Sequence, residues 1–296
     1  MGFQSAIDKF LEYLRYEKKQ SKHTHLAYQT DLQQFKTYLS LVYQITDLNA
    51  FNHLQIRSWM AHLMGEGVSA RSIARKLSSL KSLYKFLMKE DLVQQNPLNK
   101  IVAPKISKKL PVYVEQKAMD TLLNVTEFPE GFEGLRDSLI LNMYYGTGMR
   151  QSELIGLRLN QIDAFKRQVK VLGKRNKERI IPITNDLAKK IEIYLDFCKQ
   201  ENIISEVLFC NEKGEPLYAK KVYNLVHKYL SQVTTIQKRS PHVLRHTYAT
   251  HMLNNGADLN AIKELLGHAN LSATQVYTHN SIERLKQVYK KRHPRA

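Results

Sequence analysis

The sequence predicts a mainly α-helical protein, in which a helical bundle is followed by a mixed, mostly helical second domain with one small antiparallel β-ribbon. Apolar residues recur at helical spacing through the first hundred residues, and no convincing strand interrupts them. A stretch that contains Pro97, Pro104 and Pro111 then breaks the pattern. Beyond it, two short segments enclose a polar turn, as two paired strands do.

Four helices are expected in the first domain, each from an apolar stripe along one face. Thr24 is the expected N-cap of the second helix, and the fourth opens near Ser69, because hydroxyl side chains accept hydrogen bonds from free N–H groups there. Gly65 and Gly67 end the third stripe. In chain order the stripes are Phe3, Ile7, Phe10, Leu11 and Leu14; Tyr28, Leu32, Phe35 and Leu39; Leu54, Trp59 and Leu63; and Ile73, Leu77, Leu80, Tyr84 and Leu87.

We expect the helical bundle at residues 1–95, a linker at 96–112 and the second domain at 113–296, with a C-terminal tail helix at about 281–296. Proline prevents regular structure in the linker. The lysines of this segment keep it solvated or in contact with phosphate. They are Lys100, Lys105, Lys108 and Lys109.

The second domain is expected to consist of helices around one β-ribbon. Gly146-Thr147-Gly148 separates the first two helices, and Pro182 marks an edge strand because proline cannot donate to a neighbouring strand. The expected elements are helices at 135–145, 150–157, 185–200 and 219–232 and strands at Gln168–Leu172 and Arg179–Ile183.

Cap residues delimit two further helices near the C-terminus. Ser240, with Pro241 in the first helical position, begins a helix that Gly256 can end. Asp258 can cap the next helix, and Gly267 can end it in a left-handed conformation.

Positive charge is the main compositional clue to function. The 296 residues include 45 Lys+Arg and 27 Asp+Glu, a formal net charge of +18. Residues 1–110 hold 17 basic and 8 acidic residues and residues 111–296 hold 28 and 19, so each part carries +9. Such an excess argues for a polyanionic partner, most simply nucleic acid, which both parts would contact.

Several classes of protein are not expected. No apolar run is long enough to cross a bilayer, and residues 1–20 lack the apolar core of a signal peptide. Two cysteines, Cys198 and Cys210, are too few for a disulfide scaffold and fit a reducing cytoplasm. His242 and His246 have i,i+4 spacing, but no third ligand is evident, and no GxxxxGK[ST] loop occurs. We therefore predict neither a metal site nor a cofactor.

One short segment has the residue types of a phosphate clamp. His242 and Arg245 share a helical face near a helix N-terminus, which already favours an anion. Each candidate also has an ordinary interpretation, because a single histidine or tyrosine is more often a core or surface residue. Likewise Arg150 and Lys174 could simply face solvent, and Tyr277 is one of 16 tyrosines.

The order of the motifs carries more information than any one of them. Gly146-Thr147-Gly148-Met149-Arg150, a ribbon turn with Lys174, His242-x-x-Arg245, Leu266-Gly267-His268 and Tyr277 follow one another along the chain. This constellation resembles the tyrosine recombinase (integrase) family. The resemblance covers essentially the whole chain and implies a helical, SAM-like core-binding domain, a basic linker and a catalytic domain. The length and the ending His293-Pro294-Arg295-Ala296 are similar to the Xer branch, the bacterial chromosome-dimer resolvases.

The resemblance implies six catalytic residues, all of the expected type. Arg175 stands where Xer proteins often have glycine, which leaves Lys174 and Lys177 as alternatives for the ribbon lysine, although the register favours Lys174. The implied set is Arg150, Lys174, His242, Arg245, His268 and Tyr277.

These residue types suit attack on a phosphodiester. Arg150 and Arg245 can grip the non-bridging oxygens of a dianionic transition state with forked hydrogen bonds, and His268 adds a donor. Tyr277 is the implied nucleophile and forms a 3′-phosphotyrosyl bond. His242 would accept or relay its proton.

The lysine of the ribbon completes the implied reaction. Lys174 would protonate the departing 5′ oxygen. The covalent intermediate retains the energy of the phosphodiester, so a 5′ hydroxyl of a second strand can reverse the step without ATP or metal.

DNA binding is predicted to be shared by two helices of the first domain. The helix at 69–89 and the helix that starts at Thr24 are expected to approach the major groove, with contacts mainly to phosphate. An ordinary solvated face is the alternative. The predicted DNA-binding residues are Thr24, Tyr28, Arg71, Arg75 and Lys76.

The predicted function is site-specific recombination of double-stranded DNA at a palindromic-like, dif-like site, in chromosome-dimer resolution. The family implies a homo- or hetero-tetramer on two DNA sites, with a second Xer-type recombinase, regulation by a DNA translocase, and a cytoplasmic, nucleoid-associated location without membrane contact. Alternatives are an integrase or invertase of a mobile element, a topoisomerase-like nicking and closing enzyme, and a catalytically silent architectural DNA-binding protein.

An apolar stripe in the tail has two interpretations. Ile282, Leu285 and Val288 could dock onto a neighbouring protomer, as family logic favours, or pack in cis on their own domain.

Overall fold

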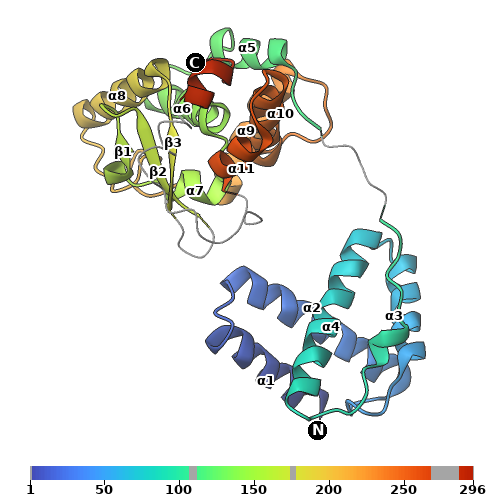
Figure 1. Cartoon of the computed structure of the whole chain (residues 1–296). Coiled ribbons are helices and arrows are strands. Elements are labelled where there is room, and N and C mark those ends of the chain that lie inside the picture. Colours follow the sequence, from blue (N-terminus) through green and yellow to red (C-terminus); the bar gives the residue numbers. More distant parts are fainter. Residues whose placement is uncertain (1, 107–111, 174–177, 268–286, 296) are drawn as a thin grey trace. The chain divides into compact units, whose positions relative to one another are not determined.

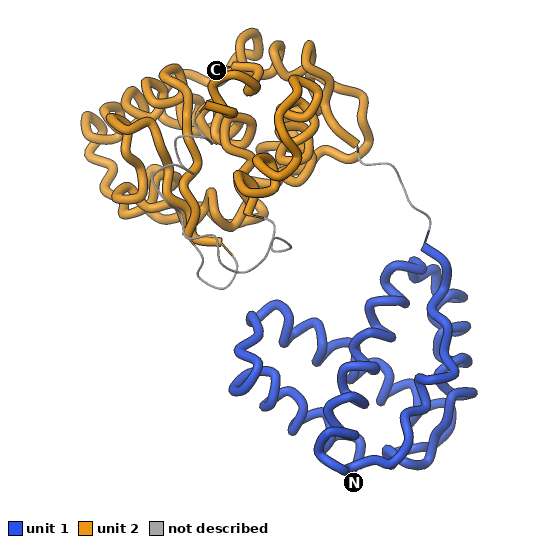
Figure 2. Tube along the Cα trace, viewed as in Figure 1, with its two compact units in different colours: residues 1–109 blue, residues 110–296 orange. Residues whose placement is uncertain are grey.

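The computed structural model describes residues 2–106, 112–173, 178–267 and 287–295. The chain forms two compact units, residues 1–109 (unit 1) and 110–296 (unit 2), each with its own apolar core (Figure 2). No helix in these described ranges is long and apolar enough to cross a membrane.

Unit 1 contains the four predicted helices, and their apolar stripes form its core (Figure 1). Leu54 is an exception: 57% of its surface is exposed, because Ile56 fills the inward position in that turn. Tyr28 is only partly buried at the edge of the core. The helices are α1 (Phe3–Tyr16), α2 (Lys22–Tyr43), α3 (His53–Gly65) and α4 (Ala70–Lys89).

One of the two predicted N-caps of unit 1 is confirmed. Ser69 Oγ accepts a hydrogen bond from the N–H of Ser72, as predicted for α4. The Thr24 prediction is wrong, because α2 already begins at Lys22. Ser21 is its N-cap, in extended backbone, and accepts from the N–H of Thr24 at 3.2 Å.

The first part of the predicted linker belongs to unit 1. Pro97–Lys100 forms a short 3₁₀ helix (η1), which Asn96 caps by accepting from the N–H of Leu98. Leu98 and Ile101 are buried in the core of unit 1, so solvated chain begins later than residue 96. Lys108 and Lys109 lie outside the described residues.

Unit 2 is mostly helical with one small sheet, as predicted (Figure 1). The sequence reasoning missed α5 and β1, because a nine-residue helix and a two-residue strand give little periodicity. The helices are α5 (Gln116–Asn124), α6 (Phe132–Thr147), α7 (Gln151–Ile155), α8 (Asn185–Gln200), α9 (Ala219–Val233), α10 (Pro241–Asn254) and α11 (Leu259–Leu266), with a 3₁₀ turn η2 (Leu159–Gln161) before the sheet.

The described sheet is antiparallel in the order β1-β2-β3, with β1 at Ile162–Asp163, β2 at Gln168–Leu172 and β3 at Glu178–Pro182. Pro182 therefore lies on an edge strand, as predicted. Val171 pairs with Arg179 across the ribbon, and both side chains are buried. The turn with Lys174 lies outside the described residues.

Helix α6 is the centre of unit 2. It packs against α8, α10, α5 and α7, and nearly all of its second half is buried. The predicted caps of α11 are confirmed: Asp258 accepts from two N–H groups of that helix, and Gly267 ends it at φ +66°. These short-range signals fix where α11 begins and ends. Ser240 precedes α10 as predicted, but its side chain forms no cap hydrogen bond, and Asn255 stands at the C-cap directly before Gly256.

The described part of the C-terminal tail packs in cis on unit 2. Tyr289 Oη donates to the carbonyl of Gly146 at 2.7 Å, and Val288 is partly buried in the same apolar cluster. Val288 thus packs on its own domain in this structure, and docking of the tail on a neighbouring protomer stays a prediction. Ile282 and Leu285 lie outside the described residues.

Candidate active site

The site begins at the C-terminal end of α6, where three helices come close together. Gly148 ends α6 in the left-handed region, at φ +59°. A Cβ there would lie 2.5 Å from Tyr248 of α10 and 2.8 Å from Leu266 of α11. Only glycine fits this backbone position, which brings the end of α6 against α10 and α11.

Arg245 of α10 spans this junction. Its Nη1 donates to the carbonyl of Gly148 and its Nη2 to the carbonyl of Leu266, both at 2.7 Å. Burial, followed by repulsion from Arg150 and Arg179, lowers the pKa of Arg245 to about 10. The guanidinium therefore stays cationic at neutral pH. It uses two of its five N–H donors within the described part of the chain.

Arg150 stands directly before α7 and is held by that helix's first turn. Glu153 Oε2 accepts from the backbone N–H of Arg150, and Oε1 accepts from its Nη1, both at 2.7 Å. Arg150 Nη2 donates to the carbonyl of Gly267 at 2.9 Å. The side chain of Arg150 remains 28% exposed, so it can also reach a ligand in solvent.

The carboxylate of Glu153 also forms a forked ion pair with Arg179 of β3. Both Nη atoms of Arg179 donate to Glu153 at 2.8 Å, and both side chains are at most 4% exposed. Burial alone would raise the pKa of Glu153, but Arg179 and then Arg150 lower it to about 2. Glu153 is therefore ionised at every physiological pH.

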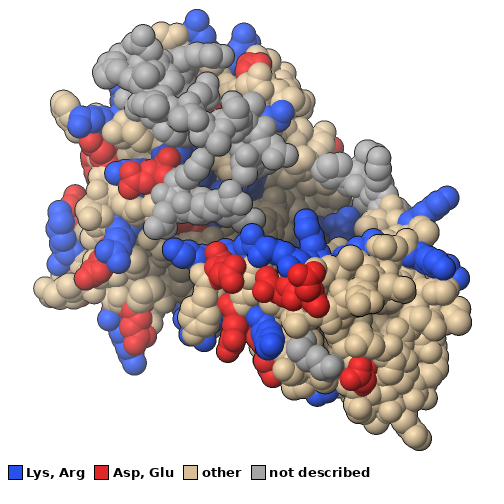
Figure 3. Space-filling view, turned by 60° about the horizontal axis from the view of Figure 1, so that its bottom comes forward, with Lys and Arg blue, Asp and Glu red and all other residues tan. Residues whose placement is uncertain are grey.

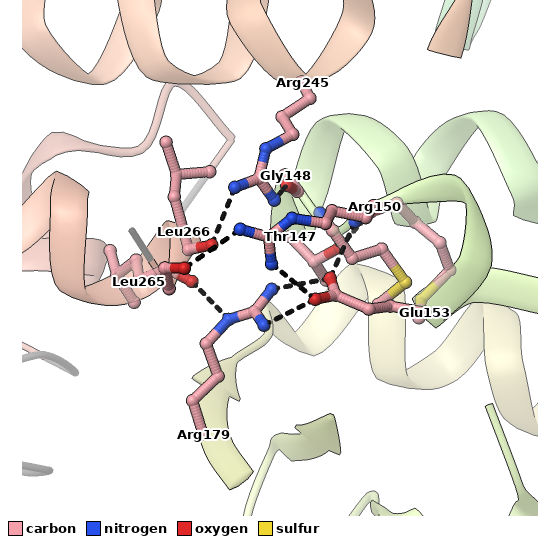
Figure 4. Close-up of polar contacts among 11 residues, drawn as sticks. Thr147, Gly148, Arg150, Glu153, Arg179, Arg245, Leu265 and Leu266 are labelled. Carbon is pink, nitrogen blue, oxygen red and sulfur yellow. Dashed lines mark hydrogen bonds and ion pairs between the residues drawn. The ribbon is translucent and has the colours of Figure 1, made fainter. Parts of the chain in front are cut away.

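Three guanidiniums thus converge on the last turn of α11 (Figure 4). The C-terminal carbonyls of a helix lack partners within the helix and carry partial negative charge. Arg150, Arg179 and Arg245 bring three positive charges against the one negative charge of Glu153. This fixed cluster has a net positive charge and suits a dianionic ligand.

The structure brings two of the six predicted catalytic residues together. Arg150 and Arg245 bind adjacent carbonyls at the end of α11. His242 lies on α10 three residues before Arg245, with its side chain exposed. The other three lie outside the described residues, and their roles stay predictions; they are Lys174, His268 and Tyr277.

Sequence reasoning missed Glu153 and Arg179, although each had a local signal. Glu153 lies three residues after Arg150, which is the spacing of a capping box. Arg179 lies two residues before the buried Ile181, so the two-residue period of a strand puts both on the inward face. A buried arginine requires an anion, and Glu153 is the anion that Arg179 binds.

Three of the predicted DNA-binding residues make contacts inside unit 1. Lys76 is buried, with Nζ 3.2 Å from Asp31 Oδ1 and a further hydrogen bond to Gln34. Tyr28 Oη lies 3.3 Å from Ser82 Oγ, and Thr24 Oγ1 lies 2.9 Å from Ser21 Oγ. Lys76 therefore points into the unit, since the buried carboxylate of Asp31 needs a cation.

The other two predicted residues reach solvent. Arg71 is exposed, and Arg75 is 52% exposed while it forms an ion pair with Asp31. Lys and Arg side chains lie on the described surface with Asp and Glu among them (Figure 3). Arg71 and Arg75 are therefore the two members of the predicted set that are exposed to solvent.

Comparison with known proteins gives consistent matches along the chain. Residues 113–284 match the model of the phage integrase family, and residues 7–91 match that of the phage integrase N-terminal SAM-like domain. The tyrosine recombinase XerC of Bacillus subtilis (strain 168) is 36% identical over 97% of this chain and 95% of that protein. The tyrosine recombinase XerD of Staphylococcus haemolyticus (strain JCSC1435) is 34% identical over 99% of this chain and 100% of its own length.

The fold is also similar to a solved structure. XerH site-specific recombinase bound to a palindromic difH substrate, in a post-cleavage complex, matches with a TM-score of 0.72. Its sequence is 21% identical, and the match covers 95% of this chain and 83% of that chain. The predicted fold class, a helical SAM-like bundle followed by a mostly helical domain with a small antiparallel sheet, is confirmed.

Proposed function

This chain belongs to the phage integrase family and is a tyrosine recombinase, and from that premise we propose that it resolves chromosome dimers at a dif-like site. The XerC and XerD relatives support this biological role. The observation that carries the cleavage chemistry is the pair Arg150 and Arg245, both bound to the end of α11 with N–H donors left for a phosphate. Preorganised positive charge of this kind is usually the largest contribution to phosphodiester cleavage.

The proposed reaction transfers one phosphodiester bond to the protein. The hydroxyl of Tyr277 attacks the phosphorus, the bond from phosphorus to the 5′ oxygen breaks, and the 3′ phosphate becomes linked to tyrosine. His242 receives the proton of the tyrosine, and Lys174 donates a proton to the 5′ oxygen. Attack by a 5′ hydroxyl from a second duplex reverses these steps and joins the strands.

Arg150 and Arg245 hold the non-bridging oxygens while negative charge develops on them. Because backbone carbonyls and Glu153 already fix both guanidiniums, little reorganisation is needed when the phosphate arrives. Arg245 keeps its charge throughout the physiological range, since its pKa is still about 10.

Two duplexes with two strands each require four cleavage events, which supports assembly of four protomers on two sites. The XerC and XerD relatives match at similar identity, and we propose that a second Xer-type recombinase can occupy half of the tetramer. The reaction would take place on chromosomal DNA in the cytoplasm, with a DNA translocase as a regulator.

A nicked suicide DNA substrate tests the chemistry. The wild type should form a covalent protein–DNA complex that resists denaturant, and Tyr277→Phe should form none. Arg245→Ala should bind the same DNA and cleave it about 1,000-fold more slowly, the scale expected for losing a main charge-stabilising donor. A covalent complex of equal yield with Tyr277→Phe contradicts the assignment of the nucleophile.

Recombination assays test the biological role. Two copies of a dif-like site should recombine with this chain, alone or mixed with a second Xer recombinase. Relaxation of supercoils without recombination would instead support a topoisomerase-like enzyme, and binding without cleavage would support an architectural protein.

A further inference from the structure

The carbonyls of Leu265, Leu266 and Gly267, at the C-terminal end of α11, bind three different arginines (Figure 4). The carbonyl of Leu265 accepts from Arg179 Nε at 2.8 Å, next to the carbonyls that bind Arg245 and Arg150. The reaction proposed above uses Arg150 and Arg245. That reaction assigns no role to Arg179.

Arg179 links two parts of the site. Its Nε binds α11, and its two Nη atoms bind the two oxygens of Glu153. The same two oxygens hold the backbone N–H and Nη1 of Arg150. A displacement of Arg179 would therefore change the position of Arg150 through Glu153 and the position of the helix end directly.

Close packing at Gly267 is a second sign of this link. Gly267 is left-handed, and a Cβ on it would lie 3.1 Å from both Cδ and Nη1 of Arg179. The absent side chain leaves space for the guanidinium of Arg179 to lie against the backbone. The peptide that joins Gly267 to His268 begins at the carbonyl that Arg150 binds.

We propose that Arg179 is a positioning residue for DNA cleavage, which rests on the function proposed above: it holds Glu153 and the end of α11 in one geometry, so that Arg150 and Arg245 present their remaining donors together. Arg179 is not a catalytic residue, because its side chain is only 4% exposed and all three of its nitrogens bind protein. Without it, Arg150 is the remaining hydrogen-bond partner of the Glu153 carboxylate among the described residues, and Arg150 would be drawn away from phosphate.

The test compares three variants of the full chain. Arg179→Gln removes the positive charge. Arg179→Lys keeps the charge but cannot form the two parallel hydrogen bonds of the guanidinium to Glu153. Arg136→Gln is the matched control, since Arg136 is also a buried arginine of unit 2, with ion pairs to Glu133 and Asp137. Cleavage is measured on the nicked suicide DNA with the protein in excess, and DNA affinity and the folded fraction are measured on the same samples.

Arg179→Gln should cleave about 100-fold more slowly than the wild type, because a misplacement of about 1 Å in a reacting group costs that much. Its DNA affinity should change by less than about twofold, since Arg179 does not reach the surface. Arg179→Lys should be intermediate, and Arg136→Gln should cleave at the wild-type rate per folded molecule.

The pH profile separates positioning from general support of the fold. Among the described residues, the charged groups that face Glu153 are Arg150 from its own turn, Arg179 from β3 and Arg245 from α10. Loss of Arg179 leaves Glu153 buried with weaker partners, so the pKa of Glu153 should rise. The ratio of the Arg179→Gln rate to the wild-type rate at the same pH should then decline as the pH falls from about 8 to about 5.5, and Arg179→Lys should restore the pH profile of the wild type.

A ¹³C titration of the Glu153 carboxyl gives an answer that does not depend on activity. Glu153 should stay ionised to below pH 4 in the wild type and titrate at higher pH in Arg179→Gln. Wild-type cleavage rates in Arg179→Gln, a loss matched by Arg136→Gln, or an unchanged Glu153 titration each overturn the positioning role. A wild type that forms no covalent complex overturns the proposed function instead, and the titration still decides whether Arg179 controls Glu153.

Discussion

Each unit contains a buried carboxylate that binds cations, and the two clusters are built differently. Asp31 of α2 accepts hydrogen bonds from Arg75, Lys76 and Ser79, which all lie within two turns of α4. Glu153 binds Arg150 from its own turn and Arg179 from β3. The Asp31 cluster joins two neighbouring helices.

The Glu153 cluster has a longer reach. Its two arginines continue to the end of α11, so one carboxylate connects α7, the ribbon and the helix that precedes His268. The partners of Asp31 all lie on α4, so this cluster stabilises the packing of two helices of unit 1. The Glu153 cluster joins α7, β3 and the end of α11, so it can also fix the relative positions of the arginines of the candidate site.

The largest effect should come from breaking the Glu153 cluster. Glu153→Gln leaves Arg179 buried without its anion and should destabilise unit 2 by about 3 kcal/mol at pH 7, besides slowing cleavage. Thermal and denaturant unfolding of the full chain, with hydrogen exchange to assign the unit, measures the change. Glu133→Gln is the matched control: Glu133 also pairs with an arginine three residues away but is 51% exposed, so its loss should cost little.

Glu153→Gln should also remove the part of the acid-induced loss of stability that comes from protonation of Glu153. The pKa of Glu153 in the folded protein is about 2, below its ordinary value, so its contribution to stability is complete above about pH 4.5 and lost as the pH falls toward 2. Burial lowers the pKa of His293 to about 4, so charging that histidine costs stability from about pH 6.5 downward in both proteins. A wild-type acid profile in Glu153→Gln contradicts the assignment.

Sequence patterns predicted the parts of the molecule that depend on neighbours a few residues apart. Ser69, Asp258 and Gly267 act at helix ends through bonds to residues within one turn, and their positions were predicted correctly. The prediction of Thr24 as an N-cap was wrong because Ser21, one turn earlier, provides the hydroxyl that caps α2. The prediction that Leu54 is a core residue was wrong because an apolar residue on an irregular stripe can face solvent.

Long-range pairs were beyond the reach of these patterns. Arg179 is 26 positions from Glu153 and 86 from Leu265, and no helical or strand period relates them. The resemblance to a family supplied Arg150 and Arg245, while the residues that fix them emerged only with the fold. Lys76 shows the opposite error, since its basic side chain suggested phosphate and its buried position serves Asp31.

A smaller effect is expected from the Asp31 cluster. Asp31→Asn leaves the buried Lys76 without an anion and should destabilise unit 1 by about 2 kcal/mol, while cleavage of saturating DNA by folded protein stays unchanged. Hydrogen exchange of the full chain should report faster opening of α2 and α4 only. Asp8→Asn, on the exposed face of α1, is the control. Slow cleavage by Asp31→Asn at saturating DNA would remove the distinction between the two clusters.

The smallest effect should come from Arg71, and it sharpens the comparison because Arg71 is exposed and makes no ion pair within the described residues. Arg71→Ala should weaken DNA binding about threefold and reduce the dependence of log affinity on log salt by about one phosphate contact, with no change in the stability of unit 1. Arg75→Ala should weaken DNA binding and also lower the stability of unit 1, since Arg75 forms an ion pair with Asp31. Lys9→Ala, an exposed cation of α1, is the matched control and should leave the salt slope unchanged. If Arg71→Ala leaves the slope unchanged too, α4 does not contact phosphate through this residue, and the positive charge of unit 1 acts only at long range.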